Sequence, residues 1–331
     1  MARDVPIGDL ALKKISLLLA AFWCSAVLAG CGRVPEDLRY SAQRLEEMSA
    51  DVSLERARAD SFAENLCVVM GTEESQDAFV NAESAALFSI DDREVLFQKQ
   101  AFERMHPASI TKIMTALLAV KYGNLDEMVT VGEEVVIQEA GASMCNIHPG
   151  EQLTLRQLLY GLMLPSGNDA GAAIAVHMGG TLEGFSKLMN EEARKLGATD
   201  THFVNPHGLT ESTHLTTAYD LYLILQEALN YPAFRDIIST AEYTVNYQDA
   251  EGKFVQQTWN NSNKYLTGAE PTPNGLQVIG GKTGTTNAAG YCLILASEAD
   301  DGKEYISVVL KAGSRTDLYD NMTNIICKIV N

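Results

Sequence analysis

The chain has 331 residues, 46% of them hydrophobic and 21% charged, which is the composition of a globular protein with a sizeable buried core. Its formal net charge is −18 and it holds no basic run, which argues against a nucleic-acid surface, because phosphate binding needs a basic face. The length allows one large domain or two ordinary ones.

The first thirty residues have the pattern of an export signal. Lys13 and Lys14 precede an uncharged stretch of fifteen residues, ISLLLAAFWCSAVLA, which is too short to span a bilayer comfortably but suits a signal-peptide core. It runs into LAGC, residues 28–31, which resembles the lipobox of bacterial lipoproteins. We therefore expect lipidation at Cys31 and anchoring on the outer face of the bacterial cytoplasmic membrane. A coincidental cysteine after an ordinary leader is the alternative.

Residues 31–62 are rich in charge and carry only a weak heptad of apolar residues, which predicts a partly helical stalk or linker. The folded domain is expected over residues 63–331. Four further cysteines lie in that domain: Cys67, Cys145, Cys292 and Cys327. The apolar contexts of Cys292 and Cys327 favour small buried side chains, because a domain of this size does not need disulfides; disulfide pairing is the alternative.

The expected elements follow in chain order. Two apolar runs, residues 83–90 and 93–99, are split by Asp91 and Asp92 and predict a β-hairpin. Helices are predicted after the candidate caps Thr154 and Thr181, and over residues 216–230. A polar hairpin at 246–254 precedes strands at 275–286, 289–298 and 304–313, and a helix at 316–330 closes the chain. Strands at both ends with helices between them predict an α+β fold: an antiparallel sheet flanked by helices, with an all-helical lobe inserted.

A serine and a lysine stand one helical turn apart in HPASITK, residues 106–112, where Pro107 is well placed to pre-set the first turn. Residues three apart share a helix face, so Ser109 and Lys112 are neighbours. A lysine drawn into an apolar helix tends to lose its charge and is then a possible base for a serine nucleophile. The alternative is an N-terminal serine beside a lysine that extends its amine to solvent.

Two further motifs follow. Ser166-Gly167-Asn168 lies between two predicted helices, and Lys282-Thr283-Gly284 lies on a predicted strand. S-x-x-K, an S-D-N-type triplet and K-T-G are together the signature of class A β-lactamases and penicillin-binding proteins. From about Glu83 to its C-terminus, including NPHGL, the chain resembles the low-molecular-mass penicillin-binding proteins, specifically serine-type D-Ala-D-Ala carboxypeptidases. The resemblance implies a β-lactamase/transpeptidase-like fold with the active site between sheet and lobe.

The resemblance also implies a role for each motif residue. Ser109 would be the acylated nucleophile and Lys112 its base. Ser166 would relay a proton to the departing D-alanine, and Asn168 would hold the acyl side chain. The terminal carboxylate of the substrate would be bound by Lys282, Thr283 and Thr285, beside Gly284. His207, in NPHGL, falls in a loop near the active-site mouth, where it orders the loop or a water or is an ordinary turn residue. On physical grounds, the N–H groups of Ser109 and Thr285 suit an oxyanion, and Lys282 near Lys112 lowers the pKa of the latter.

Several alternatives stay open at this point. The leading function removes the last D-alanine from peptidoglycan pentapeptides and is blocked by β-lactams; a D,D-endopeptidase acting on cross-links has the same motifs. A class A β-lactamase needs an E-x-x-L-N-like loop, which none of the available glutamates provides: Glu183, Glu191, Glu192 and Glu211. The least favoured alternative is an inactive lipid-anchored binding protein. No cofactor is expected, and no metal, because the histidines lack ligand spacing.

The resemblance has two departures. Only 47 residues follow Gly284, so we expect the C-terminal β-rich domain and anchor helix of many relatives to be absent. The position after K-T-G holds Thr285, where some relatives have histidine, which leaves the rate of deacylation open.

Overall fold

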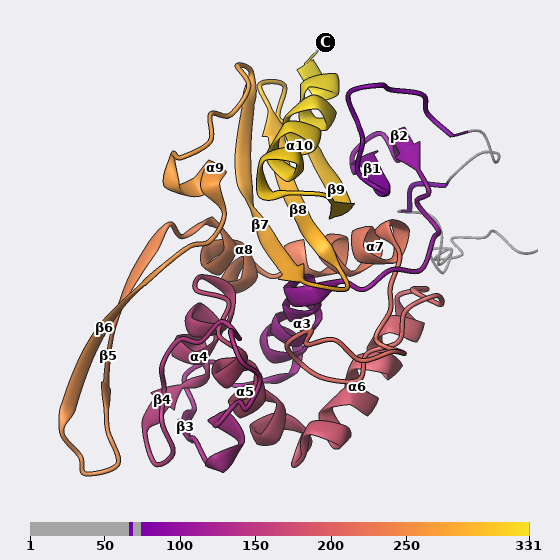
Figure 1. The fold of residues 1–331 in the computed structure, drawn as a ribbon. Coiled ribbons are helices and arrows are strands. Elements are labelled where there is room, and N and C mark those ends of the chain that lie inside the picture. Colours follow the sequence, from indigo (N-terminus) through magenta and orange to yellow (C-terminus); the bar gives the residue numbers. More distant parts are fainter. Residues whose placement is uncertain (1–65, 69–73, 331) are drawn as a thin grey trace, which may run out of the picture. The chain divides into compact units, whose positions relative to one another are not determined.

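A five-stranded antiparallel sheet, in the order β2-β1-β9-β8-β7, joins strands from the two ends of the domain (Figure 1). Its strands are β1 (Ser84–Ser89), β2 (Glu94–Lys99), β7 (Leu276–Thr286), β8 (Gly290–Ala299) and β9 (Glu304–Ala312). The computed structural model describes residues 66–68 and 74–330, within a compact unit that spans Phe62–Asn331. The expected signal peptide, Cys31 and the stalk lie outside the described residues.

The two hairpins predicted in this sheet are confirmed. β1 pairs with β2 across the turn at Asp91 and Asp92, and β8 pairs with β9 across Asp301 and Gly302. Gly302 has φ +81°, a conformation that glycine adopts without strain. The middle of β8 is buried, because helices cover both faces of the sheet there. This is why its sequence is a continuous apolar run instead of an alternating one.

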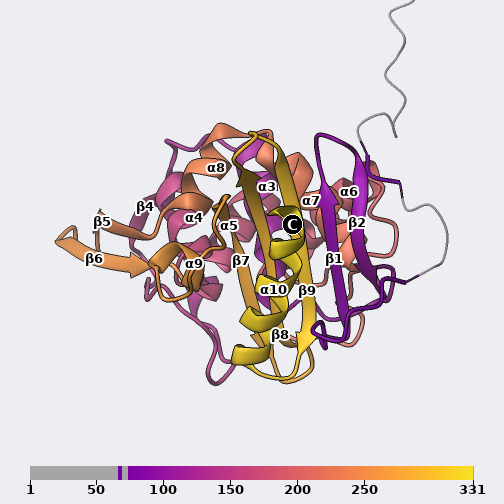
Figure 2. The ribbon, with the colours of Figure 1, turned by 90° about the horizontal axis from the view of Figure 1, so that it is seen from above.

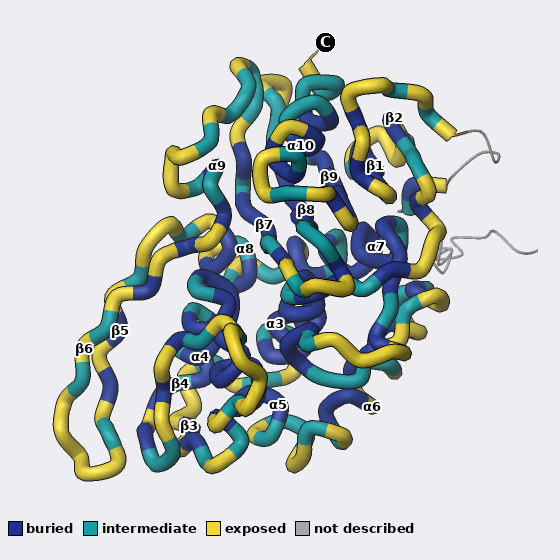
Figure 3. The backbone as a smooth tube through the Cα atoms, viewed as in Figure 1, coloured by how far each residue is buried: buried dark blue, intermediate teal, exposed yellow. Residues whose placement is uncertain are grey.

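Helices cover both faces of the sheet. α10 (Arg315–Val330) packs on β8 and β9, while α7 (Ala218–Leu229) and α8 (Pro232–Ser239) pack on the other face (Figure 2). The buried apolar residues accordingly divide into two clusters, a smaller one under α10 and a larger one between the sheet and the remaining helices. In Figure 3 the central strands and α3 (Lys112–Tyr122) are buried over most of their length.

The lobe contains three further long helices: α4 (Leu155–Met163), α5 (Asn168–Gly179) and α6 (Leu182–Lys195). The predicted caps are confirmed. The Thr154 side chain accepts the Gln157 N–H in a full capping box, and the Thr181 side chain accepts the Gly184 N–H. α3, α4 and α5 contact one another, so the lobe has its own interior next to the sheet.

The expectation of an all-helical lobe requires a correction. Four strands, β3 (Met128–Thr130), β4 (Gln152–Thr154), β5 (Glu242–Gln248) and β6 (Phe254–Asn260), form a second antiparallel sheet beside the helices. β3 and β4 have three residues each, which is too short for an alternating pattern to be recognised. The β5–β6 hairpin was predicted, but its pairing with β4 rests on a single register position, Gln152 with Gln248.

The four cysteines of the described residues form no disulfide with one another; Cys67, Cys145 and Cys292 are buried and Cys327 is half-buried. Among the described residues, no helix has both the length and the apolar character needed to cross a membrane.

Candidate active site

The predicted nucleophile stands at the entrance to the central helix of the lobe. Ser109 lies in a 3₁₀ turn, Ala108–Thr111, that follows Pro107 and continues directly into α3. Ala108 has φ +47°, which is costly for a residue with a side chain, so the surrounding structure must hold the turn in place.

Lys112 is fully buried and its amine has three neighbours. Nζ lies 3.0 Å from Ser109 Oγ, 2.6 Å from Asn168 Oδ1 and 2.7 Å from the His207 carbonyl oxygen. The amide oxygen and the carbonyl can only accept hydrogen bonds. A neutral amine, which has two N–H groups and one lone pair, therefore donates to those two acceptors and turns its lone pair to the Ser109 hydroxyl. This is the arrangement that a general base requires.

The environment favours that neutral form. Burial lowers the pKa of Lys112 well below its ordinary value, and the nearby charge of Lys282 lowers it further, while Asp169 acts in the opposite direction. Lys282 is itself buried, which lowers its pKa to about 7, and its Nζ donates to the Thr283 carbonyl at 2.9 Å. Burial therefore favours the neutral form of both motif lysines, Lys112 and Lys282.

The Ser166-Gly167-Asn168 triplet connects α4 to α5 and approaches the nucleophile from the lobe. Ser166 has φ +66°, and a Cβ at Gly167 would lie 2.7 Å from the Gly161 carbonyl oxygen, so the turn has room only for glycine there. The buried Asp169 carboxylate accepts the Cys145 N–H at 2.9 Å and so ties a neighbouring loop to this turn. Ser166 and Asn168 are thereby held on the Ser109 side of the lobe.

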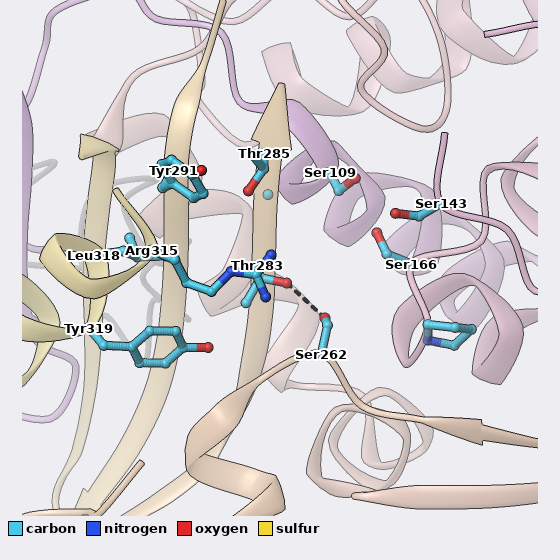
Figure 4. A pocket seen from close by; sticks show the side chains of 12 residues that line it. Ser109, Ser143, Ser166, Ser262, Thr283, Thr285, Tyr291, Arg315, Leu318 and Tyr319 are labelled. Atoms are coloured by element: carbon cyan, nitrogen blue, oxygen red, sulfur yellow. Dashed lines mark hydrogen bonds between the residues drawn. The ribbon is translucent and has the colours of Figure 1, made fainter. Parts of the chain in front are cut away.

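The K-T-G motif approaches from the sheet, on the edge strand β7. A Cβ at Gly284 would lie 2.9 Å from the Pro107 carbonyl oxygen and 3.0 Å from the Ser109 nitrogen. Glycine is therefore what allows the strand to lie against the nucleophile turn. The Thr283 hydroxyl shares a 2.7 Å hydrogen bond with the Ser262 hydroxyl, which holds it at the rim of the cleft (Figure 4).

Two cavities meet at the nucleophile, and both are lined by Ser109 and Thr285. The smaller, about 150 Å³, is also lined by Ser166, Thr283 and Gly284; the larger, about 420 Å³, is lined by Asn168 and His207. A substrate can therefore pass over Ser109 with one part in each cavity. The N–H groups of Ser109 and Thr285 remain the predicted oxyanion donors.

Sequence reasoning missed the cation of the smaller cavity. Arg315, at the start of α10, lines this cavity and directs its guanidinium toward Thr283 (Figure 4), whereas Lys282 lines neither cavity. Arg315 is thus a second candidate, besides Lys282, for binding the terminal carboxylate of the substrate. No spacing rule connects an arginine 33 positions after Lys282 with the motif; only the packing of α10 against the sheet brings the two together.

His207 is buried and contributes its backbone carbonyl to the site instead of its ring, whose pKa burial lowers to about 3. The glutamates considered for a β-lactamase, Glu183, Glu191, Glu192 and Glu211, line neither cavity. In the described part of the chain, no three His, Cys, Asp or Glu side chains gather in a way that would hold a metal ion.

Comparisons with known proteins identify relatives of this chain. The D-alanyl-D-alanine carboxypeptidase DacF of Bacillus subtilis is 36% identical over 238 residues, 70% of this chain and 58% of that protein. A D-alanyl-D-alanine carboxypeptidase from a Streptomyces species is 35% identical over 232 residues, 66% of this chain and 77% of that protein. The crystal structure of a Streptomyces DD-transpeptidase aligns with a TM-score of 0.70 at 31% identity, covering 78% of this chain and 98% of that one.

The solved structure confirms the expected α+β, transpeptidase-like fold. The chain spans 58% of the length of the Bacillus relative and of DacC from Escherichia coli, to which it is 36% identical over 248 residues. The family profile of the D-alanyl-D-alanine carboxypeptidases matches residues 70–314, and by this match the chain belongs to the D-alanyl-D-alanine carboxypeptidase family.

Proposed function

We propose that this protein is a serine D,D-carboxypeptidase that removes the terminal D-alanine from peptidoglycan pentapeptides and is inhibited by β-lactams. The observation that carries the proposal is the environment of the Lys112 amine, whose two acceptors, Asn168 Oδ1 and the His207 carbonyl, leave its lone pair to Ser109. The relatives from Bacillus subtilis, Escherichia coli and Streptomyces matched by sequence are each named D-alanyl-D-alanine carboxypeptidase, which supports the choice of substrate.

In the proposed acylation, the substrate places its terminal carboxylate in the smaller cavity, beside Arg315 and the Thr283 hydroxyl. Lys112 takes the proton from Ser109 as Oγ forms a bond to the carbonyl carbon of the penultimate D-alanine. The oxyanion is stabilised by the backbone N–H groups of Ser109 and Thr285, which the fold holds in place before the reaction. Ser166 relays that proton from Lys112 to the leaving nitrogen, the bond between this nitrogen and the carbonyl carbon breaks, and free D-alanine departs.

In the proposed deacylation, the departure of D-alanine empties the smaller cavity and gives water access to the ester. A penicillin behaves differently, because its leaving group stays attached to the acyl-enzyme. Neither cavity holds one of the four glutamates considered for a water-activating role. We therefore expect stoichiometric trapping by penicillin, with release over minutes or longer. Nitrocefin turnover at tens per second with intact peptides would instead identify a β-lactamase.

The decisive experiment gives the purified protein a pentapeptide and a cross-linked peptide dimer in parallel. Free D-alanine from the pentapeptide supports the carboxypeptidase, while cleavage of the dimer alone would assign the protein to the endopeptidases. Ser109→Ala is expected to abolish both D-alanine release and the covalent penicillin adduct. Release by that variant at the wild-type rate, or an adduct on another residue, would show that the nucleophile is wrongly assigned.

We also propose that the protein is exported and anchored by a lipid at Cys31. The support is the sequence alone, the fifteen-residue apolar core followed by LAGC. Cys31→Ala is expected to release the protein from the membrane fraction or to leave its signal peptide uncleaved. Membrane association and mass identical to those of the wild type would exclude the lipid anchor.

A further inference from the structure

We propose that His214 is a positioning residue for the nucleophile, because it holds both ends of the segment that carries Ser109. The inference rests on the proposed acyl-enzyme function and adds to it a residue that belongs to none of the three motifs. His214 lies in the loop between α6 and α7, about a hundred positions after Ser109, and is 1% exposed.

The ring and the carbonyl oxygen of His214 take part in three hydrogen bonds. Its Nε2 lies 2.7 Å from the Thr111 hydroxyl, its Nδ1 accepts the Val204 N–H at 3.0 Å, and its carbonyl oxygen lies 3.0 Å from His106 Nδ1. His106 stands three residues before Ser109 and Thr111 two residues after it. One residue therefore contacts both sides of the nucleophile turn.

The partners of the ring fix its tautomer. A backbone N–H can only donate, so Nδ1 of His214 must carry a lone pair and the proton of the neutral ring resides on Nε2. Nε2–H then donates to the Thr111 hydroxyl, which is fully buried. Thr111 directly precedes Lys112, so the bond fixes the turn at the point where the nucleophile and its base are set relative to each other.

Other residues of the same loop contact the turn and the residues on either side of it. Met105 and Thr216 exchange backbone hydrogen bonds of 2.7 and 2.9 Å, and the Thr115 hydroxyl donates to the Pro206 carbonyl at 2.6 Å. A Cβ at Gly208 would lie 1.8 Å from the Ala108 carbonyl oxygen. Ala108 is the residue with the strained φ, so the turn depends on these outside contacts to keep its conformation.

The function expected from this arrangement is specific to the chemical step. Neither His214 nor Thr111 lines either cavity, so substrate and β-lactam binding do not depend on them directly. A misplacement of the nucleophile by a fraction of an ångström to one ångström lowers the rate of the chemical step by up to about 100-fold. Loss of the His214–Thr111 bond should therefore lower the acylation rate constant and leave the dissociation constant of the preceding complex unchanged.

The experiment measures these two constants for a fluorescent penicillin by stopped flow, for the wild type, His214→Asn, Thr111→Val and the double variant. Asn at position 214 keeps an acceptor for the Val204 N–H but loses the Nε2 donor, and Val at 111 keeps the shape of Thr without its hydroxyl. We expect each single variant to acylate about 10 to 100 times more slowly, and the double variant no more slowly than the slower single one, because both remove the same bond.

Two controls separate positioning from general destabilisation. Thr111→Ser keeps the hydroxyl that Thr111→Val removes, and it is expected to acylate at nearly the wild-type rate. His202→Asn removes an exposed ring of the same loop, which bonds the Thr213 carbonyl, and is expected to leave the rate unchanged. Thermal unfolding of each variant reports its folding, and if His214→Asn does not fold, the comparison of Val with Ser at position 111 decides.

The inference is overturned if Thr111→Val acylates as fast as Thr111→Ser, or if the variants weaken binding while the acylation constant stays at its wild-type value. A wild-type protein that forms no penicillin adduct at all would instead overturn the proposed function.

Discussion

Asn168→Asp tests the claim that Lys112 acts as a neutral base. The substitution replaces one amide nitrogen by oxygen and leaves the shape of the side chain almost unchanged. Asn168 Oδ1 is 2.6 Å from the Lys112 Nζ, so the new carboxylate places a negative charge within hydrogen-bond distance of the amine. An opposite charge at this distance favours the protonated form of a lysine and raises its pKa.

The magnitude follows from that distance. At an effective dielectric constant of about 20, two unit charges 2.6 Å apart attract by about 6 kcal/mol. Burial of a carboxylate opposes this gain, since Asn168 is 3% exposed. Even if one third remains, about 2 kcal/mol, the fraction of neutral Lys112 falls more than tenfold at any pH at or below the wild-type pKa of this residue. General-base assistance is worth about 10² to 10⁴ in rate, so the loss is easily measured.

The assay is the pH dependence of penicillin acylation. Acylation needs neutral Lys112, so its rate rises with pH through the pKa of this residue, and a raised pKa moves that rise to higher pH. Asn168→Asp should therefore be most impaired at low pH and recover in part as the pH increases. Asn168→Ala, which adds no charge, should show a deficit that does not recover. The control Asn246→Asp, on the exposed face of β5, should match the wild type. An unchanged profile for Asn168→Asp would refute the neutral-base argument.

Three further outcomes are expected. Arg315→Ala should raise KM by about 10- to 100-fold for peptides that end in a free carboxylate and leave it unchanged for amidated peptides, because a charge-assisted hydrogen bond contributes about 1.5–3 kcal/mol. Gly208→Ala should destabilise the protein by about 2–5 kcal/mol, from a left-handed φ of +85° and contact with Ala108, as thermal unfolding measures. Gly252→Ala, at a position with a similar φ of +80° but open space around it, should lose only the stability that corresponds to the left-handed φ. Among the described residues that line the larger cavity, Glu139 is the only formally charged one, so Glu139→Gln should remove a preference in kcat/KM for peptides with a free amine over acetylated ones.

The parts of the structure that the sequence predicted depend on local signals. Thr154 and Thr181 were recognised because a cap acts within three residues of itself, and the Asp301–Gly302 turn because its chemistry is contained in two residues. S-x-x-K could be interpreted because a helix brings Ser109 and Lys112 together from a fixed spacing.

The parts that it did not predict depend on contacts between distant segments. Thr111 and His214 are 103 positions apart, and the loop that carries His214, between α6 and α7, has no repeating pattern from which a contact could be inferred. Arg315 enters the smaller cavity only because α10 packs on the sheet. The helical lobe acquired its small sheet in the same way, since β3 and β4 become strands by pairing with each other across 21 intervening residues.

A comparison within α3 explains why the apolar character of a helix is not enough to identify a base. Lys112 and Lys121 lie on the same helix, nine positions apart, and both lose solvent on folding. Lys121 forms ion pairs of 2.8 and 2.6 Å with Glu192 and Glu227, which raise its pKa, so it stays charged and serves the structure. Lys112 has a hydroxyl, an amide oxygen and a backbone carbonyl as its partners, and its pKa falls. The difference between a structural lysine and a catalytic one therefore lies in whether the acceptors that the fold supplies are charged or neutral. At Asn168, the replacement of one nitrogen by oxygen turns a neutral acceptor into a charged one.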